Sequence, residues 1–297
     1  MTRITANGIA IEYESFGDAG NDTILLIMGL GTQLTAWPDT FCEKLVNSGY
    51  RVIRFDNRDI GLSTHLTDAP TPNIPLLAGL RMLRLLPPVP YTLDDMSEDA
   101  IGLLDVLGIE RAHVVGASMG GMIAQLLAAR FPQRTLSLTS IMSTTGNRAL
   151  PRANRQATRA LLIKPDDPLD PQSVIARNVT VRKAVQSPVY PKSQEELYAA
   201  AAGAFHRGGY DPAGVARQLA AVIVSGDRRR LLRRITVPSL VMHGDADPLV
   251  KVACGVDTAR NLAGATLKIF PGMGHDFPEP LLEAMAEEIH RIAVKAA

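Results

Sequence analysis

The sequence is poor in cysteine and in long apolar runs. Its two cysteines, Cys42 and Cys254, follow no metal-binding spacing among 297 residues, and we expect a reduced pair rather than a disulfide. The longest apolar stretch, residues 74–86, contains Arg81 and Arg84 and is too short to span a bilayer. The first residues carry no apolar segment of the kind that a signal peptide needs. We therefore expect a cytoplasmic protein.

No charge of either sign is in large excess. The chain has 31 Lys and Arg residues against 30 Asp and Glu residues, a net charge of +1, so the composition indicates neither nucleic acid nor a membrane surface as a partner. No histidine spacing indicates a metal. Hydrophobic residues make up 46% and charged residues 21%, as in a globular protein with one large or two small domains. A monomer and a dimer both fit this composition.

The chain does contain a strand, a sharp turn and a helix centred on Ser118. A β-branched run leads into Gly-Ala-Ser-Met-Gly, residues 116–120, and helix-forming residues follow. Gly116 and Gly120 leave room for a strained turn that lifts the serine hydroxyl out of the sheet. The amide of Met119, at the helix N-terminus, is free to face a negative charge on a substrate carbonyl. The pattern predicts a nucleophile elbow.

A later aspartate and a later histidine complete a catalytic set with Ser118. A serine hydroxyl needs a base within hydrogen-bond reach, and that base needs an acid to orient it. Asp247 and His275 each follow a predicted strand, so both belong at the carboxyl edge of the sheet, where reactive groups gather. We predict Ser118 as nucleophile, His275 as base and Asp247 as acid. Asp245 is the alternative acid, and we favour Asp247 because the Asp-Pro pair places it at the turn of its loop.

The remaining pattern predicts an α/β fold. Residues 3–16 form a hairpin that turns at Asn7-Gly8, and the apolar run 23–28 is a strand covered on both faces. The charged loop 56–63 is interpreted as structural, held by its own salt bridges. Residues 66–90 contain six prolines around an apolar stretch, which predicts a long loop that covers the core or acts as a lid.

Charge divides the chain into two parts. Residues 146–230 hold fourteen Lys or Arg against seven Asp or Glu, whereas the remainder holds seventeen against twenty-three. The basic segment is rich in helix formers, so we predict a helical cap over residues 146–230 and a core formed by residues 1–145 and 231–297. Its basic side chains are expected to face solvent or to pair with the acidic core.

These motifs resemble the α/β-hydrolase superfamily over essentially the whole chain. They resemble most its esterase, perhydrolase and lactonase branch, including a bacterial group typified by anthracycline methylesterases. The resemblance implies a mostly parallel eight-stranded sheet flanked by helices, an antiparallel second strand, a cap after the sixth strand and no cofactor. It also implies a triad of Ser118, Asp247 and His275, with the backbone amides of Leu30 and Met119 as the oxyanion hole.

One position departs from the family pattern: many relatives carry His-Gly before the first oxyanion residue, and this chain has Met28-Gly29. The leading hypothesis is a serine hydrolase that cleaves a small-molecule carboxylic ester through an acyl-enzyme at Ser118. Perhydrolysis, lactone opening, carbon–carbon hydrolysis and acyl transfer are alternatives that use the same triad. A binding protein built on a hydrolase scaffold is the alternative from another class.

Overall fold

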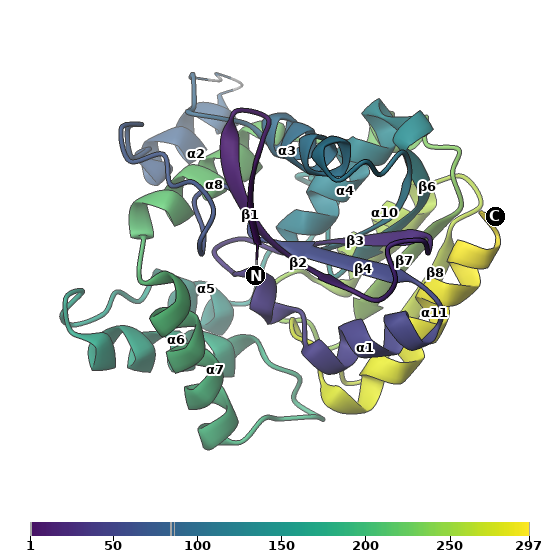
Figure 1. The fold of residues 1–297 in the computed structure, drawn as a ribbon. Coiled ribbons are helices and arrows are strands. Elements are labelled where there is room, and N and C mark those ends of the chain that lie inside the picture. Colours follow the sequence, from purple (N-terminus) through teal and green to yellow (C-terminus); the bar gives the residue numbers. More distant parts are fainter. Residues whose placement is uncertain (1, 84, 86, 297) are drawn as a thin grey trace.

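The computed structural model describes residues 2–83, 85 and 87–296. Its centre is an eight-stranded sheet in the order β1-β2-β4-β3-β5-β6-β7-β8 (Figure 1). Strand β2 is antiparallel to both its neighbours, and all other pairs are parallel, which confirms the predicted sheet. The strands are β1 (Thr2–Ala6), β2 (Ile9–Phe16), β3 (Thr23–Ile27), β4 (Arg51–Phe55), β5 (Ala112–Ala117), β6 (Thr135–Ile141), β7 (Ser239–Gly244) and β8 (Thr266–Phe270).

The edge hairpin forms because its turn residues tolerate a left-handed backbone. Asn7 has a φ of 48° and Gly8 a φ of 76°, the conformation that a two-residue hairpin turn requires. Strands β1 and β2 then pair from Ala6 and Ile9 outwards. The hairpin predicted over residues 3–16 is confirmed.

Helices cover both faces of the sheet because its central strands are apolar on both sides. In β3, Leu25 and Ile27 join the core under α3, α4 and α10, whereas Ile24 and Leu26 join the core under α1 and α11. These helices are α1 (Asp39–Asn47), α3 (Leu93–Val106), α4 (Met119–Arg130), α10 (Val252–Asn261) and α11 (Leu282–Val294). The short elements are η1 (Leu34–Ala36), η2 (Pro132–Arg134), η3 (Glu279–Leu281) and α9 (Arg229–Leu232).

In the described part of the chain, five helices stand between β6 and β7: the short α9 and four longer helices, which gather at one side of the sheet in Figure 1. The four longer helices are α5 (Arg155–Leu162), α6 (Pro171–Val185), α7 (Gln194–Gly208) and α8 (Pro212–Ser225). Helices α6 to α8 form the cap of the fold. None of the helices in the described ranges is long and apolar enough to cross a membrane.

The proline-rich segment is not the long loop that the sequence predicted. Residues 74–82 form helix α2 (Ile74–Met82), which packs against α8. Asn73 caps it by accepting the Leu76 N–H at 3.1 Å, and Pro75 stands in the first turn, where the missing N–H has no helical partner to lose. Proline therefore begins a helix here. Residues 84 and 86 of the same segment lie outside the described residues.

Candidate active site

Ser118 lies at the bend between β5 and α4 with a φ of 55° and a ψ of −118°. This left-handed backbone is strained for any residue with a side chain. The bend is possible only because the flanking residues have no side chain: a Cβ on Gly116 would lie 2.1 Å from Gly120 O, and one on Gly120 would lie 2.0 Å from Ile27 O. The two glycines thus permit the close contact of strand, turn and helix that the sequence predicted.

Hydrogen bonds from a neighbouring strand hold the bend in place. The Ser118 N–H donates to Ile141 O at 2.9 Å, at the end of β6. The Ser143 hydroxyl donates to Ser118 O at 2.7 Å. Because its backbone is held by others, the Ser118 side chain is free to point toward the histidine loop.

The structure brings the three predicted side chains into one hydrogen-bonded chain. His275 Nε2 lies 3.0 Å from Ser118 Oγ, and His275 Nδ1 lies 2.7 Å from Asp247 Oδ2. They come from the ends of β5, β7 and β8, which meet at the same edge of the sheet. A serine, an imidazole and a carboxylate in this order can activate the hydroxyl as a nucleophile.

Asp247 is oriented by its own loop. Its Oδ1 accepts the N–H groups of Leu249 and Val250, each at 2.8 Å, and this leaves Oδ2 for His275. Burial raises the pKa of this carboxyl, but the charge and hydrogen bond of His275, together with His243 and the Val250 N–H, outweigh burial, so the pKa lies below its usual value. Asp245, the alternative acid, instead accepts the Gly272 N–H at 2.7 Å and does not contact the triad.

The cap holds the loop that carries the histidine, a support that the sequence did not predict. His275 N–H donates to Val185 O at 2.8 Å, at the end of α6, and Gly274 N–H donates to Ser187 Oγ at 2.8 Å. The Ser187 hydroxyl in turn donates to Asp276 at 2.5 Å. The position of the imidazole thus depends on the cap as well as on the core.

The two predicted oxyanion amides face no protein acceptor. Within the described part of the chain, neither the Leu30 N–H nor the Met119 N–H makes a hydrogen bond. The loop after β3 passes so close to the elbow that a Cβ on Gly29 would lie 3.0 Å from Ser118 Cβ. Gly29, the residue before Leu30, therefore lies against the serine, and neither amide is occupied by an acceptor within the described residues.

A family model described as the alpha/beta hydrolase fold matches residues 22–279. The chain belongs to this family. A 28% identical relative is the rhodomycin D methylesterase DauP of Streptomyces sp. (strain C5), with 96% of this chain and 95% of the relative aligned. A second is 3-oxoadipate enol-lactonase 2 of Acinetobacter baylyi, 29% identical over 90% of this chain and 86% of that protein. The crystal structure of the enol-lactonase from Burkholderia xenovorans LB400 shares the fold, with a TM-score of 0.74, 22% identity, and 99% and 100% of the two chains covered.

In this alpha/beta hydrolase the charged loop 56–63, after β4, joins neighbouring parts of the core and the cap through hydrogen bonds and ion pairs. Asp56 accepts N–H groups from Leu34 at 2.7 Å and Leu62 at 2.9 Å, and it pairs with Arg207 of the cap at 2.6 Å. Arg58 forms two hydrogen bonds of 2.6 Å with Asp99 of α3, which follows the structural interpretation of this loop. Arg207 also shows that basic cap residues pair with the acidic core.

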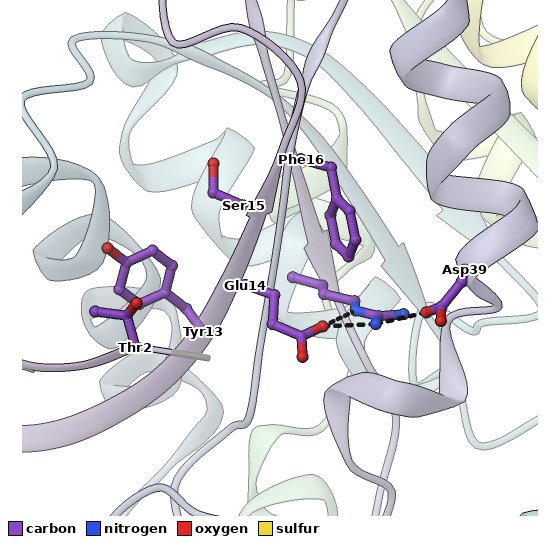
Figure 2. Close-up of a pocket in the computed structure, with 7 residues that line it drawn as sticks. Thr2, Tyr13, Glu14, Ser15, Phe16 and Asp39 are labelled. Carbon is purple, nitrogen blue, oxygen red and sulfur yellow. Dashed lines mark hydrogen bonds and ion pairs between the residues drawn. The ribbon is translucent and has the colours of Figure 1, made fainter.

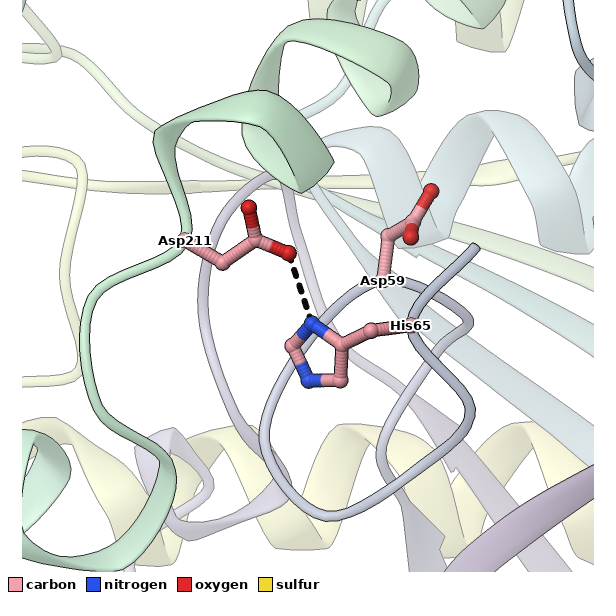
Figure 3. Close-up of side chains that lie close together, drawn as sticks. All are labelled: Asp59, His65 and Asp211. Carbon is pink, nitrogen blue, oxygen red and sulfur yellow. Dashed lines mark hydrogen bonds and ion pairs between the residues drawn. The ribbon is translucent and has the colours of Figure 1, made fainter. Parts of the chain in front are cut away.

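Asp59, His65 and Asp211 lie close enough together to suggest a metal site (Figure 3). Arg217 argues for another interpretation. Its guanidinium donates to both oxygens of Asp59, at 2.7 and 2.8 Å, and lies 3.7 Å from Asp211. His65 Nδ1 contacts Asp211 at 2.7 Å, and its Nε2 contacts Gly61 O at 3.1 Å. The arginine supplies the positive charge that the carboxylates need, so this cluster is an ion-pair network that joins cap helix α8 to the core.

We expect Arg217→Met to destabilise the protein strongly. Both Arg217 and Asp59 are almost fully buried, and removing one partner leaves an uncompensated charge, which costs about 3–5 kcal/mol. The free energy of unfolding, measured by guanidinium denaturation, checks this. Arg291→Met is the matched control: Arg291 is exposed, and its pairs are worth under about 1 kcal/mol. Equal losses in the two variants would contradict the ion-pair interpretation.

His65 makes the stability of the cap junction depend on pH. Burial lowers the pKa of this imidazole, but the hydrogen bonds to Asp211 and Gly61 O and the negative charges of Asp211 and Asp59 together outweigh burial, so the folded-state pKa lies above the usual value. The stabilisation is therefore complete below about pH 6.5, the ordinary value for histidine, and is lost as the pH rises through the raised folded value. We expect His65→Gln to lose at most about 1 kcal/mol at pH 5.5 and less at pH 8.5, measured by urea unfolding. His206→Gln, the same change at an exposed position outside the ion-pair network, is the control, and an equal pH dependence in the two variants would contradict the assignment to His65.

A separate cleft of about 410 Å³ lies beside β2 and α1 (Figure 2), and no predicted triad residue lines it. Arg54 lines this cleft. Its guanidinium pairs with Glu14 at 2.5 Å and with Asp39 at 2.6 Å, and it donates to Trp37 O at 2.5 Å. These contacts occupy the charge of Arg54. The cleft thus contains no predicted triad residue and no free cation among its lining side chains.

Proposed function

We propose that this alpha/beta hydrolase is a serine hydrolase that cleaves a small-molecule carboxylic ester through an acyl-enzyme at Ser118. The observation that carries the proposal is the continuous hydrogen-bonded chain from Ser118 Oγ through His275 to buried Asp247. The two free amides beside the serine support it. The related methylesterase and enol-lactonase both act, by their names, on carboxylic acid derivatives.

In the first step Ser118 Oγ attacks the ester carbonyl while His275 Nε2 accepts the hydroxyl proton. Asp247 holds the ring with Nδ1 protonated and stabilises the positive charge that forms. The carbonyl oxygen becomes an anion and accepts hydrogen bonds from the Leu30 and Met119 amides. The ester C–O bond then breaks, and His275 returns the proton to the alcohol that leaves.

In the second step a water molecule hydrolyses the acyl-enzyme. His275 Nε2 accepts a proton from the water as its oxygen attacks the acyl carbon, and the same two amides hold the second oxyanion. The bond to Ser118 Oγ breaks, and the proton returns to the serine. The products are a carboxylic acid, an alcohol and the starting enzyme.

We also propose the domain division: a cap over residues 146–230 and a core from residues 1–145 and 231–297. Helices α5 to α8 fall inside the first range, and all eight strands fall inside the second. Contacts from α6 and α8 reach the two loops that carry His275 and Leu30. A cap placed in this way borders the space in which the substrate binds.

A panel of esters and lactones tests the function. We expect purified protein to hydrolyse p-nitrophenyl acetate and a methyl ester of an aromatic carboxylic acid, with kcat/KM lost in Ser118→Ala. Lactone opening is the second candidate because of the similarity to an enol-lactonase, and a simple γ-lactone in the same panel distinguishes it. No turnover of any ester or lactone by the wild-type protein would contradict the proposal.

A further inference from the structure

The Leu30 amide is oriented through the carbonyl of the residue before it. Thr32 Oγ1 donates to Gly29 O at 2.9 Å. In a planar trans peptide the C=O of Gly29 and the N–H of Leu30 point in opposite directions, so a carbonyl held by Thr32 aims the N–H away from Thr32. On the preceding peptide, Asn57 Nδ2 donates to Met28 O at 2.9 Å. Side chains thus hold two consecutive peptide groups of this loop, and the Thr32 N–H adds a longer bond of 3.4 Å to the same Gly29 O.

The third peptide group is held by the cap. Gln218 of α8 accepts the Gly31 N–H through Oε1 at 2.9 Å and donates through Nε2 to Arg58 O at 2.7 Å. Its side chain is fully buried, so the bond to Arg58 O does not compete with solvent, and the bond from the Gly31 N–H is partly buried. Gly31 has a φ of 63°, and a Cβ on it would lie 3.2 Å from Val215 of the same helix. Helix α8 therefore contacts this loop through packing and through one buried amide.

Arg217, the residue before Gln218, restricts the position of the Gln218 side-chain amide. Arg217 donates to both oxygens of Asp59, so this part of α8 is anchored to the charged loop 56–63. Gln218 then joins this charged loop to the loop that carries Leu30. A side chain held at both ends in this way has little rotational freedom left.

We propose that Gln218 and Thr32 are positioning residues for the Leu30 amide, and that Gln218 makes the docked cap part of the catalytic geometry. The proposal rests on the proposed function, since it requires the Leu30 N–H to donate to a developing oxyanion. It also explains how this chain supports the loop with Met28-Gly29 in place of the His-Gly of many relatives. Oxyanion donors act only if they are held in advance, so losing one support misplaces the donor without removing it.

The central test compares Gln218→Met with wild type on p-nitrophenyl acetate, with kcat expressed per active site titrated by a fluorophosphonate. Methionine matches the length of glutamine and makes neither hydrogen bond. We expect kcat to fall about 10-fold to 100-fold, less than the loss of a whole donor, with KM within about 3-fold. Gln194→Met, an exposed glutamine of α7, is the matched control and should keep the wild-type kcat.

A second pair keeps the test decisive if Gln218→Met does not fold. Thr32→Val removes the hydroxyl with little change of shape, and Thr32→Ser retains it. We expect Thr32→Val to lose about 10-fold in kcat and Thr32→Ser to recover most of it. A purely structural role would reduce the folded fraction and leave kcat per active site unchanged.

Ser118→Ala in the same assay distinguishes failure of the proposed function from failure of the positioning role. Activity that survives Ser118→Ala would overturn the proposed function. Activity lost in Ser118→Ala, together with a wild-type kcat in both Gln218→Met and Thr32→Val, would overturn the positioning role alone. A fall in kcat with an unchanged KM in either variant, with recovery in Thr32→Ser, is the result that the structure predicts.

Discussion

Ser118→Ala is expected to lower kcat by about 10⁶-fold on a small activated ester, because a triad that acts as a unit fails when its nucleophile is removed. Alanine removes one oxygen and leaves the bend intact, since the backbone of residue 118 is held by Ile141 O and the Ser143 hydroxyl. We therefore expect the free energy of unfolding to change by less than about 1 kcal/mol. Steady-state kinetics and urea denaturation measure the two quantities.

Ser15→Ala is the control for this prediction. Ser15 is an exposed serine on β2 whose hydroxyl contacts only Arg51 among the described residues, so the loss of this hydroxyl should leave kcat unchanged. A Ser118→Ala protein that retains activity within about tenfold of wild type would mean that the nucleophile lies elsewhere.

Asp247→Asn is expected to lower kcat by about 10⁴-fold, the loss seen when a triad histidine is held in the wrong tautomer. The structure explains why the amide cannot simply replace the carboxylate. The N–H groups of Leu249 and Val250 both point at Oδ1, so an asparagine must place its oxygen there and its NH₂ toward His275. That NH₂ requires an unprotonated Nδ1. The proton then stays on Nε2, which can no longer accept the proton of Ser118.

Asp245→Asn is the matched control, two residues away and with the same chemical change. Asp245 contacts the Gly272 N–H and not the triad, and an asparagine oxygen can accept the same bond. We expect near-wild-type kcat. A loss in Asp245→Asn as large as that in Asp247→Asn would show that the acid had been assigned to the wrong residue.

The elbow was predictable because much of its constraint is local. A Cβ on Gly116 would lie 2.1 Å from Gly120 O, within the turn itself, so this requirement is visible as a short motif, whereas Gly120 is required by the approach of Ile27 O in β3. The places of Asp247 and His275 were predictable for a different reason: each follows a strand, and parallel strands bring their carboxyl ends to one edge.

Helix α2 was missed because it lacks the pattern that identifies helices. Only Leu77 of its nine residues is buried, so no apolar stripe with helical spacing exists. The signals for a helix N-terminus were present, namely Asn73 as N-cap and Pro75 in the first turn. The start was missed because the prolines were interpreted only as residues that break helices.

The supports supplied by the cap were not predictable from sequence. Gly31 and Gln218 are 187 residues apart, and Gly274 and Ser187 are 87 residues apart. A single hydrogen bond between such distant residues leaves no spacing or composition to recognise. The predicted triad residues stand in a short motif or at strand ends that the sequence reveals, whereas the residues that contact their loops from the cap become visible only in the fold.

Covalent labelling of the serine tests the central claim most directly. The wild-type protein is incubated with a fluorophosphonate, which loses fluoride as its phosphorus bonds to an activated serine oxygen, and the adduct is located by intact mass and peptide mapping. We predict one adduct per chain, on Ser118, with labelling abolished in Ser118→Ala and strongly slowed in Asp247→Asn. No adduct on the folded wild-type protein, or an adduct on a residue other than Ser118, would contradict the account.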